Sequence, residues 1–184
     1  SDLNYYSNLG PAPPKKDPAL TENQKMESGS TTYYVGNPVS NKELSLTPDG
    51  VLSLKNSTTG AKDWSTPSAG LNGAVLKFDS NAYNSGNLCI FPKTGTDPPP
   101  VWCILQRISV PTTACSRTGG GAACPPGSYS GTDLASYQNS LFNTAKLKNT
   151  TDTAARFVMI DDAGKFCMYK GSPGAIQGTS IICK

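Results

Sequence analysis

Apolar and polar residues alternate along short segments, and the same order of segments recurs three times after residue 40. Each copy contains a strand-like segment, a turn with glycine, a second such segment, a loop, and a last segment with a large apolar residue. Alternation with a period of two indicates a β-strand with one buried face, and glycine suits the positive φ of a tight hairpin. The copies span residues 44–65, 75–103 and 157–183. The pattern predicts an all-β module of three pseudo-repeated antiparallel sheets.

The alternation also assigns the two faces of each sheet. Six apolar residues of the middle segments should point into one common core: Leu52, Leu54, Leu88, Ile90, Phe166 and Met168. The same register turns Trp64, Trp102 and Ile182 of the last segments inward. Their neighbours should point away from the core: Ser53, Cys89 and Cys167 on the middle segments, and Ser65, Cys103 and Cys183 on the last.

The repeat also predicts how the six cysteines pair, because two copies carry a cysteine at both outward positions and the first copy carries serine at both. We expect disulfides between Cys89 and Cys103 and between Cys167 and Cys183. Cys115 and Cys124 remain for a third disulfide across a Gly-rich loop. An even number of cysteines in a chain without histidine favours disulfides over a metal site, and hence an oxidising, extracellular compartment.

The rest of the chain consists of an arm before this module and an insertion within it. Residues 1–40 are rich in proline and predict an extended arm with one strand, Thr32-Tyr33-Tyr34-Val35. The module itself covers residues 41–184, with an insertion at 104–155. Within the insertion, residues 104–110 predict a strand and residues 133–148 a short helix.

The strand in the arm has no partner within the arm, so its backbone groups need the edge of a sheet. One hypothesis is that it adds to a neighbouring subunit and builds a head-to-tail oligomer or filament. In layout this is similar to extracellular fibre subunits that join by strand donation. The alternative is that it folds back as the missing edge of the first sheet.

The three copies, with their pattern L-x-L-x-x-D-G-x-L-x-L followed by W-S or W-C, resemble the bulb-type mannose-binding lectins over residues 44–184. The resemblance implies a β-prism II fold, in which three four-stranded sheets surround a pseudo-threefold axis. It also implies a mannose site on each sheet, formed by a strand with the motif Q-x-D-x-N-x-V-x-Y.

This motif is degenerate in all three copies. Asn87 and Phe91 occupy its Asn and Tyr positions in the second copy, and Tyr169 occupies the Tyr position in the third. Cys89 and Cys167 replace the central Val. The resemblance therefore implies a retained scaffold with altered sugar sites, of which Asn87, Phe91 and Tyr169 are the remnants.

Composition narrows the function further. The absence of histidine excludes Ser-His and Cys-His mechanisms, and the aspartates beside turns are typical turn residues, so we expect no enzyme, metal or cofactor. A net charge of +3 without basic runs predicts no nucleic-acid partner. No apolar stretch is long enough to predict a membrane span.

Two sequons, at Asn56 and Asn149, predict N-linked glycans. Peptide mapping of secreted material tests this, and unmodified Asn56 and Asn149 would contradict it. Together these features favour a secreted, glycosylated structural protein that assembles through its arm. The alternative is a secreted carbohydrate-binding lectin with altered sugar sites.

Overall fold

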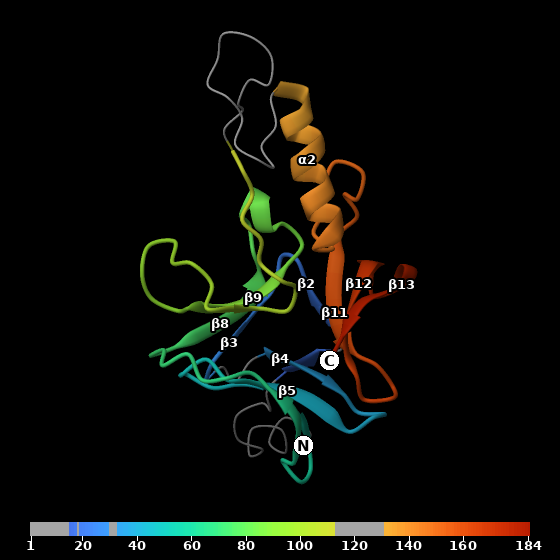
Figure 1. Cartoon of the computed structure of the whole chain (residues 1–184). Coiled ribbons are helices and arrows are strands. Elements are labelled where there is room, and N and C mark those ends of the chain that lie inside the picture. The colour runs from blue at the N-terminus through green and yellow to red at the C-terminus, as the bar shows by residue number, and fades with distance from the viewer. Residues whose placement is uncertain (1–14, 18, 30–32, 113–130) are drawn as a thin grey trace, which may run out of the picture.

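Three sheets surround a single apolar core, like the faces of a triangular prism (Figure 1). The computed structural model describes residues 15–17, 19–29, 33–112 and 131–184. Within these residues the strand order is β1-β4-β5-β6-β7 in the first sheet, β10-β9-β8-β3 in the second and β13-β12-β11-β2 in the third. All pairings are antiparallel except that of β1 with β4. The all-β, prism-like class predicted from the repeats is confirmed.

Each sequence repeat supplies three consecutive strands of one sheet. The strands are β5 (Lys42–Leu46), β6 (Leu52–Asn56) and β7 (Lys62–Ser65) in the first, β8 (Ala74–Phe78), β9 (Leu88–Pro92) and β10 (Trp102–Cys103) in the second, and β11 (Arg156–Ile160), β12 (Phe166–Ser172) and β13 (Ala175–Cys183) in the third. The turn glycines Gly50, Gly86 and Gly164 have φ of 93°, 81° and 86°. Glycine alone adopts this conformation without strain, which is why the hairpins are visible in the sequence.

The predicted inward residues form the centre of the prism. All six middle-strand residues are buried in one cluster: Leu52, Leu54, Leu88, Ile90, Phe166 and Met168. Trp64, Trp102 and Ile182 are partly buried and pack against this cluster. The rings of Trp64 and Trp102 lie 5.6 Å apart between centroids, which joins the first sheet to the second.

The structure contains the two disulfides that the repeat predicts. Cys89 pairs with Cys103 and Cys167 with Cys183, with Cα–Cα distances of 4.0 and 4.1 Å. Cys115 and Cys124 lie outside the described residues. Cys89 and Cys167, on the middle strands, point away from the core cluster, yet both are buried. At Cys89 the amide of Asn84 covers the sulfur atom, at 3.5 Å.

The first sheet lacks a disulfide but has the geometry for one. Ser53 is directly opposite Ser65, as Cys89 is opposite Cys103 and Cys167 opposite Cys183. We expect the double variant S53C/S65C to form a disulfide on oxidation. Because the closed loop has about a dozen residues, the chain-entropy model predicts about 3 kcal/mol of added stability. Urea unfolding with and without reductant measures the gain, with S53C alone as the control. Two free thiols in the oxidised double variant would contradict the shared register.

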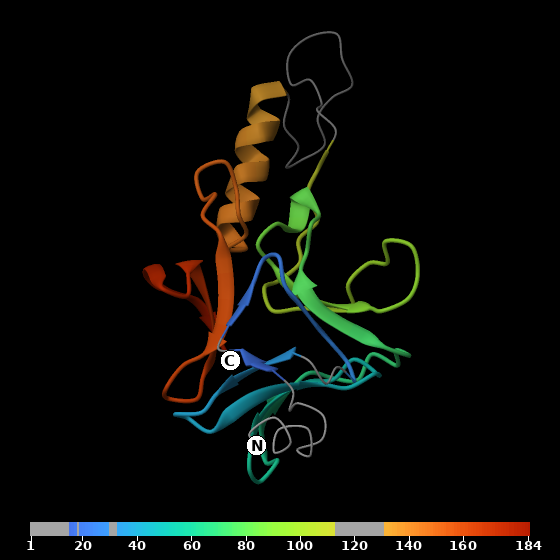
Figure 2. The same ribbon diagram turned by 180° about the vertical axis from the view of Figure 1, so that it is seen from behind.

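The segment expected to be an arm completes the prism. Three of its strands each join a different sheet: β2 (Ala19–Thr21) pairs with β11, β3 (Lys25–Glu27) with β8, and β4 (Tyr33–Asn37) with β5. We call residues 19–29 and 33–37 the strap. Figure 2 shows this blue segment running between the sheets. Leu20, Met26 and Val35 insert into the core, with at most 2% of their surface exposed. The prediction of an extended arm over residues 1–40 therefore does not hold for the strap, which is part of the prism.

The predicted assembly strand pairs within its own chain. Strand β4 lies between β5 on one side and β1 (Lys15–Asp17), in parallel, on the other. The side-chain amide of Asn37 donates to the carbonyl of Ile160 at 2.8 Å and to the carboxylate of Asp162 at 2.9 Å. The prediction that this strand pairs with a neighbouring subunit is wrong, because both of its edges already have partners in cis. Thr32 lies outside the described residues.

The insertion contains the predicted helix but not the predicted strand. Helix α2 (Gly131–Thr144) extends away from the sheets (Figure 1). Ile104 and Leu105 are both buried, but residues 104–110 form no strand. The reason is that the side chain of Asn87 takes the place of a strand partner for Leu105. The backbone N–H of Leu105 donates to Oδ1 of Asn87 at 2.9 Å, and Nδ2 of Asn87 donates to the carbonyl of Leu105 at 3.0 Å. In the part of the chain described, no helix has the length and apolarity to cross a membrane.

Candidate functional site

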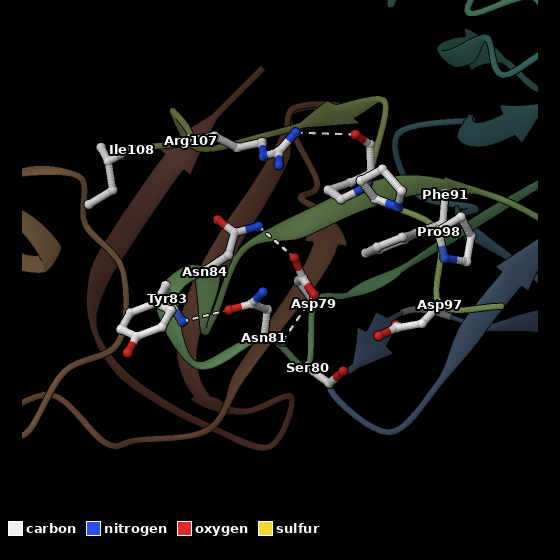
Figure 3. A pocket seen from close by; sticks show the side chains of 12 residues that line it. Asp79, Ser80, Asn81, Tyr83, Asn84, Phe91, Asp97, Pro98, Arg107 and Ile108 are labelled. Carbon is white, nitrogen blue, oxygen red and sulfur yellow. Dashed lines mark hydrogen bonds between the residues drawn. The ribbon is translucent and has the colours of Figure 1, made fainter. Parts of the chain in front are cut away.

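A hollow of about 480 Å³ lies beside the second sheet (Figure 3). Its walls come from three places: the short 3-10 helix η1 (Ala82–Asn84) with the turn before it, the proline run 98–100, and residues 107–108 beyond β10. Phe91 of β9 also lines it. The disulfide between Cys89 and Cys103 ties β9 to β10, so the walls are held on a cross-linked hairpin.

One wall of the hollow is a fixed set of carboxylate and amide groups. Asp79 accepts hydrogen bonds from the backbone N–H of Asn81 at 3.0 Å and from the side-chain amide of Asn84 at 2.8 Å. Asn81 in turn accepts a bond from the N–H of Tyr83 at 2.9 Å. An ionised carboxylate has about four acceptor positions, so Asp79 keeps capacity for further donors. The wall therefore offers oriented acceptors to a ligand with hydroxyl groups.

The other walls are apolar surfaces and one cation. Tyr83 leaves 43% of its surface exposed, and its ring stacks on Phe142 of α2 at 6.5 Å between centroids. Helix α2 thereby supports the aromatic wall. Arg107 donates to the carbonyl of Pro100 at 3.2 Å, which holds the guanidinium beside the proline run (Figure 3). Its remaining N–H groups are donors for a ligand.

A second hollow of about 350 Å³ adjoins the first. The two share five lining residues, Asp79, Ser80, Phe91, Asp97 and Pro98. In Figure 3 Phe91 and Pro98 lie next to each other on this shared boundary. We call the two hollows together the cleft, with an amide end at Asn81 and Asn84 and a lysine end in the second hollow.

The lysine end carries three ammonium groups. Lys25 and Lys93 both approach one carboxylate, that of Glu27, at 3.0 and 3.5 Å. The hydrogen bond from Lys25 holds the pKa of Glu27 below its usual value. The ammonium of Lys77 lies 4.8 Å from the ring centroid of Phe91. In the part of the chain that is described, no carboxylate forms an ion pair with Lys77.

The structure separates the three residues that the degenerate mannose motif singles out. Phe91 lines both hollows of the cleft. Asn87 is fully buried, and its amide is used by Asn84 and Leu105, so it offers nothing to a ligand. Tyr169 is on the third sheet, where its ring stacks on Phe157 at 5.4 Å and burial raises the pKa of its hydroxyl.

The amide end of the cleft was not predictable as a site. Asp79-Ser80-Asn81 has the composition of an ordinary turn, and it does form one. The one available signal is the spacing of Asn81 and Tyr83, which is typical of an Asx cap on a short helix. Nothing in that spacing indicates that residues 98–100 and 107–108 fold over the same turn.

The predicted glycan acceptors lie at turns. The side-chain oxygen of Asn56 accepts the N–H groups of Thr58 and Thr59, both at 2.9 Å, and that of Asn149 accepts the N–H of Thr151 at 2.8 Å. Their glycosylation stays a prediction. No group of three His, Cys, Asp or Glu side chains that could hold a metal ion occurs in the described residues.

Comparison with known proteins gives structural matches alone. No protein-family model matches the chain, and no curated protein matches it in sequence. One similar solved structure is a monomeric monocot mannose-binding lectin from Gastrodia elata, with a TM-score of 0.49 and 12% identity, covering 91% of this chain and 94% of that chain. Another is the mannose-specific agglutinin from snowdrop (Galanthus nivalis) bulbs with methyl-alpha-D-mannoside, with a TM-score of 0.46 and 11% identity, covering 88% of this chain and 100% of that chain.

Proposed function

We propose that this chain is an extracellular carbohydrate-binding protein and that the cleft on the second sheet is its binding site. The observation that carries the proposal is the pairing of the carboxylate of Asp79, which the buried amide of Asn84 orients, and the side chain of Asn81 with the exposed ring of Tyr83. The two disulfides favour an oxidising compartment, which supports secretion.

Sugars need this combination of groups. Each ring presents hydroxyl groups along its edge and C–H groups on its faces. A carboxylate and an amide at fixed positions accept from and donate to adjacent hydroxyls, and an aromatic ring covers the C–H face. The amide end of the cleft provides both within one hollow of about 480 Å³, a size that accommodates a single sugar ring.

The structural-assembly hypothesis loses its basis because its donor strand, β4, has partners on both edges within the same chain. The alternative function, a lectin with altered sites, is the one we propose. It differs from the motif-based expectation in location, since the buried Asn87 takes no part and residues outside the motif do.

Titration of the isotope-labelled protein with methyl glycosides of mannose, galactose and N-acetylglucosamine, followed by NMR, tests the proposal. We expect at least one sugar to bind and to shift the amide signals of residues 79–84. Asp79→Asn should weaken binding by about tenfold or more, because a hydrogen bond to a charged group contributes about 1.5–3 kcal/mol.

Asp63→Asn is the matched control, because it removes the same charge from β7 on the first sheet, outside the cleft. It should leave sugar affinity unchanged. If none of the sugars binds, or if D79N and D63N bind equally well, the cleft is not a carbohydrate site.

A further inference from the structure

The cleft is longer than a single sugar ring needs, and its two ends differ in chemistry. The amide end offers acceptors and an aromatic ring, and the lysine end offers ammonium groups. Because Phe91 and Pro98 line both hollows, a chain of two sugar units can pass across them without leaving the surface. This extension rests on the proposed carbohydrate function.

Two of the three ammonium groups at the lysine end form ion pairs. Lys25 and Lys93 share the single carboxylate of Glu27. Lys77 has the ring of Phe91 as its neighbour instead of an ion-pair partner within the described residues. A cation over an aromatic ring keeps its N–H groups available for an anion. Lys77 is on β8, opposite Lys25 of β3, and lines the second hollow.

Two further carboxylates, those of Asp79 and Asp97, lie on the shared boundary, so three carboxylates and three ammonium groups line the second hollow. Asp79 is held by the N–H of Asn81 and the amide of Asn84, which belong to the amide end. Asp97 is on the exposed turn before the proline run. The second hollow therefore has no net charge, and Lys77 differs from Lys25 and Lys93 because its ammonium forms no ion pair within the described residues.

We propose that the cleft selects an acidic oligosaccharide, with a neutral sugar at the amide end and a sugar that carries an anionic group at the lysine end, where Lys77 is the specificity residue. Carboxylate and sulfate groups share the chemistry that this arrangement recognises, because both are compact anions with several acceptor oxygens. The contact is a binding interaction with no covalent step.

The test compares three disaccharides of β-linked glucose: the neutral sugar, its counterpart with one ring oxidised to glucuronic acid, and its counterpart with one sulfate. Calorimetry at low salt should show an acidic form that binds about tenfold more tightly than the neutral one, since hydrogen bonds between charged groups are about twice as strong as neutral ones. Raising the ionic strength should reduce this preference. The carboxylated and sulfated forms distinguish the two anions.

Lys77→Gln should remove the preference and leave affinity for the neutral disaccharide within about twofold. Lys165→Gln is the control, an exposed lysine next to the turn of the third sheet. Equal binding of the neutral and acidic forms by the parent protein would overturn the inference and leave the proposed function intact. A loss of affinity for all forms in K77Q would also overturn it, because Lys77 would then only maintain the fold. Failure of all three disaccharides to bind would overturn this inference, and the proposed function would fail with it only if the methyl glycosides also did not bind.

Discussion

Leu20→Ala is expected to destabilise the whole prism, although this residue belongs to a segment whose sequence predicts an arm. Leu20 is fully buried, and β2 pairs it with Val158 of the third sheet. Truncating a buried leucine typically costs about 2–5 kcal/mol, which is a large part of the 5–15 kcal/mol that stabilises a domain. For a chain of this length the melting temperature should fall by about 2–4 °C for each kcal/mol.

Thermal and urea unfolding of L20A at two protein concentrations measures this effect and separates the two roles considered for the segment. A strap in cis predicts the same destabilisation at both concentrations. A strand that docks on a neighbouring subunit predicts a folded monomer and a loss of assembly only. Val39→Ala is the control, because Val39 follows β4 and leaves 74% of its surface exposed. Equal stability of L20A and V39A would refute the strap.

The repeats were predictable because their strands are long enough for the alternation to show. Strands β6, β9 and β12 each follow a glycine turn and bury two apolar residues on one face. This pattern occurs three times. The serine or cysteine pairs at equivalent positions add a constraint on register. Fold class, core faces and both disulfides in the described residues follow from this.

The strap and the cleft were not predictable for different physical reasons. Strands β2 and β3 have three residues each, which is too short for alternation to be distinguished from chance. Their strand conformation depends on pairing with β11 and β8, far away in the sequence. The cleft joins residues from positions 25 to 108, and its polar side chains are individually typical of turns and edge strands. Only the folded arrangement shows that they face one space.

Arg156 is a second residue whose role the sequence does not indicate, and its loss is expected to be among the most destabilising. Its side chain is fully buried between the second and third sheets. One guanidinium nitrogen donates to the carbonyls of Lys146 at 2.6 Å and Gly86 at 3.3 Å, and the other donates to Asp152 at 3.3 Å. Nε donates to no acceptor among the described residues. Arg156 thus links the segment after α2, the hairpin turn of the second sheet and strand β11.

Arg156→Met keeps an apolar side chain of similar length and removes all of these bonds. Asp152 retains Lys170 at 2.8 Å, but the buried carbonyls lose their donor. Because breaking a buried charged network from one side costs about 3–5 kcal/mol, we expect a loss of this size in urea unfolding. Hydrogen exchange should also accelerate at Leu147, whose N–H bonds to Phe142 at the end of the helix. Arg107→Met, at an exposed arginine, should change stability by less than about 1 kcal/mol. If R156M and R107M unfold at the same urea concentration, Arg156 does not hold the insertion to the prism.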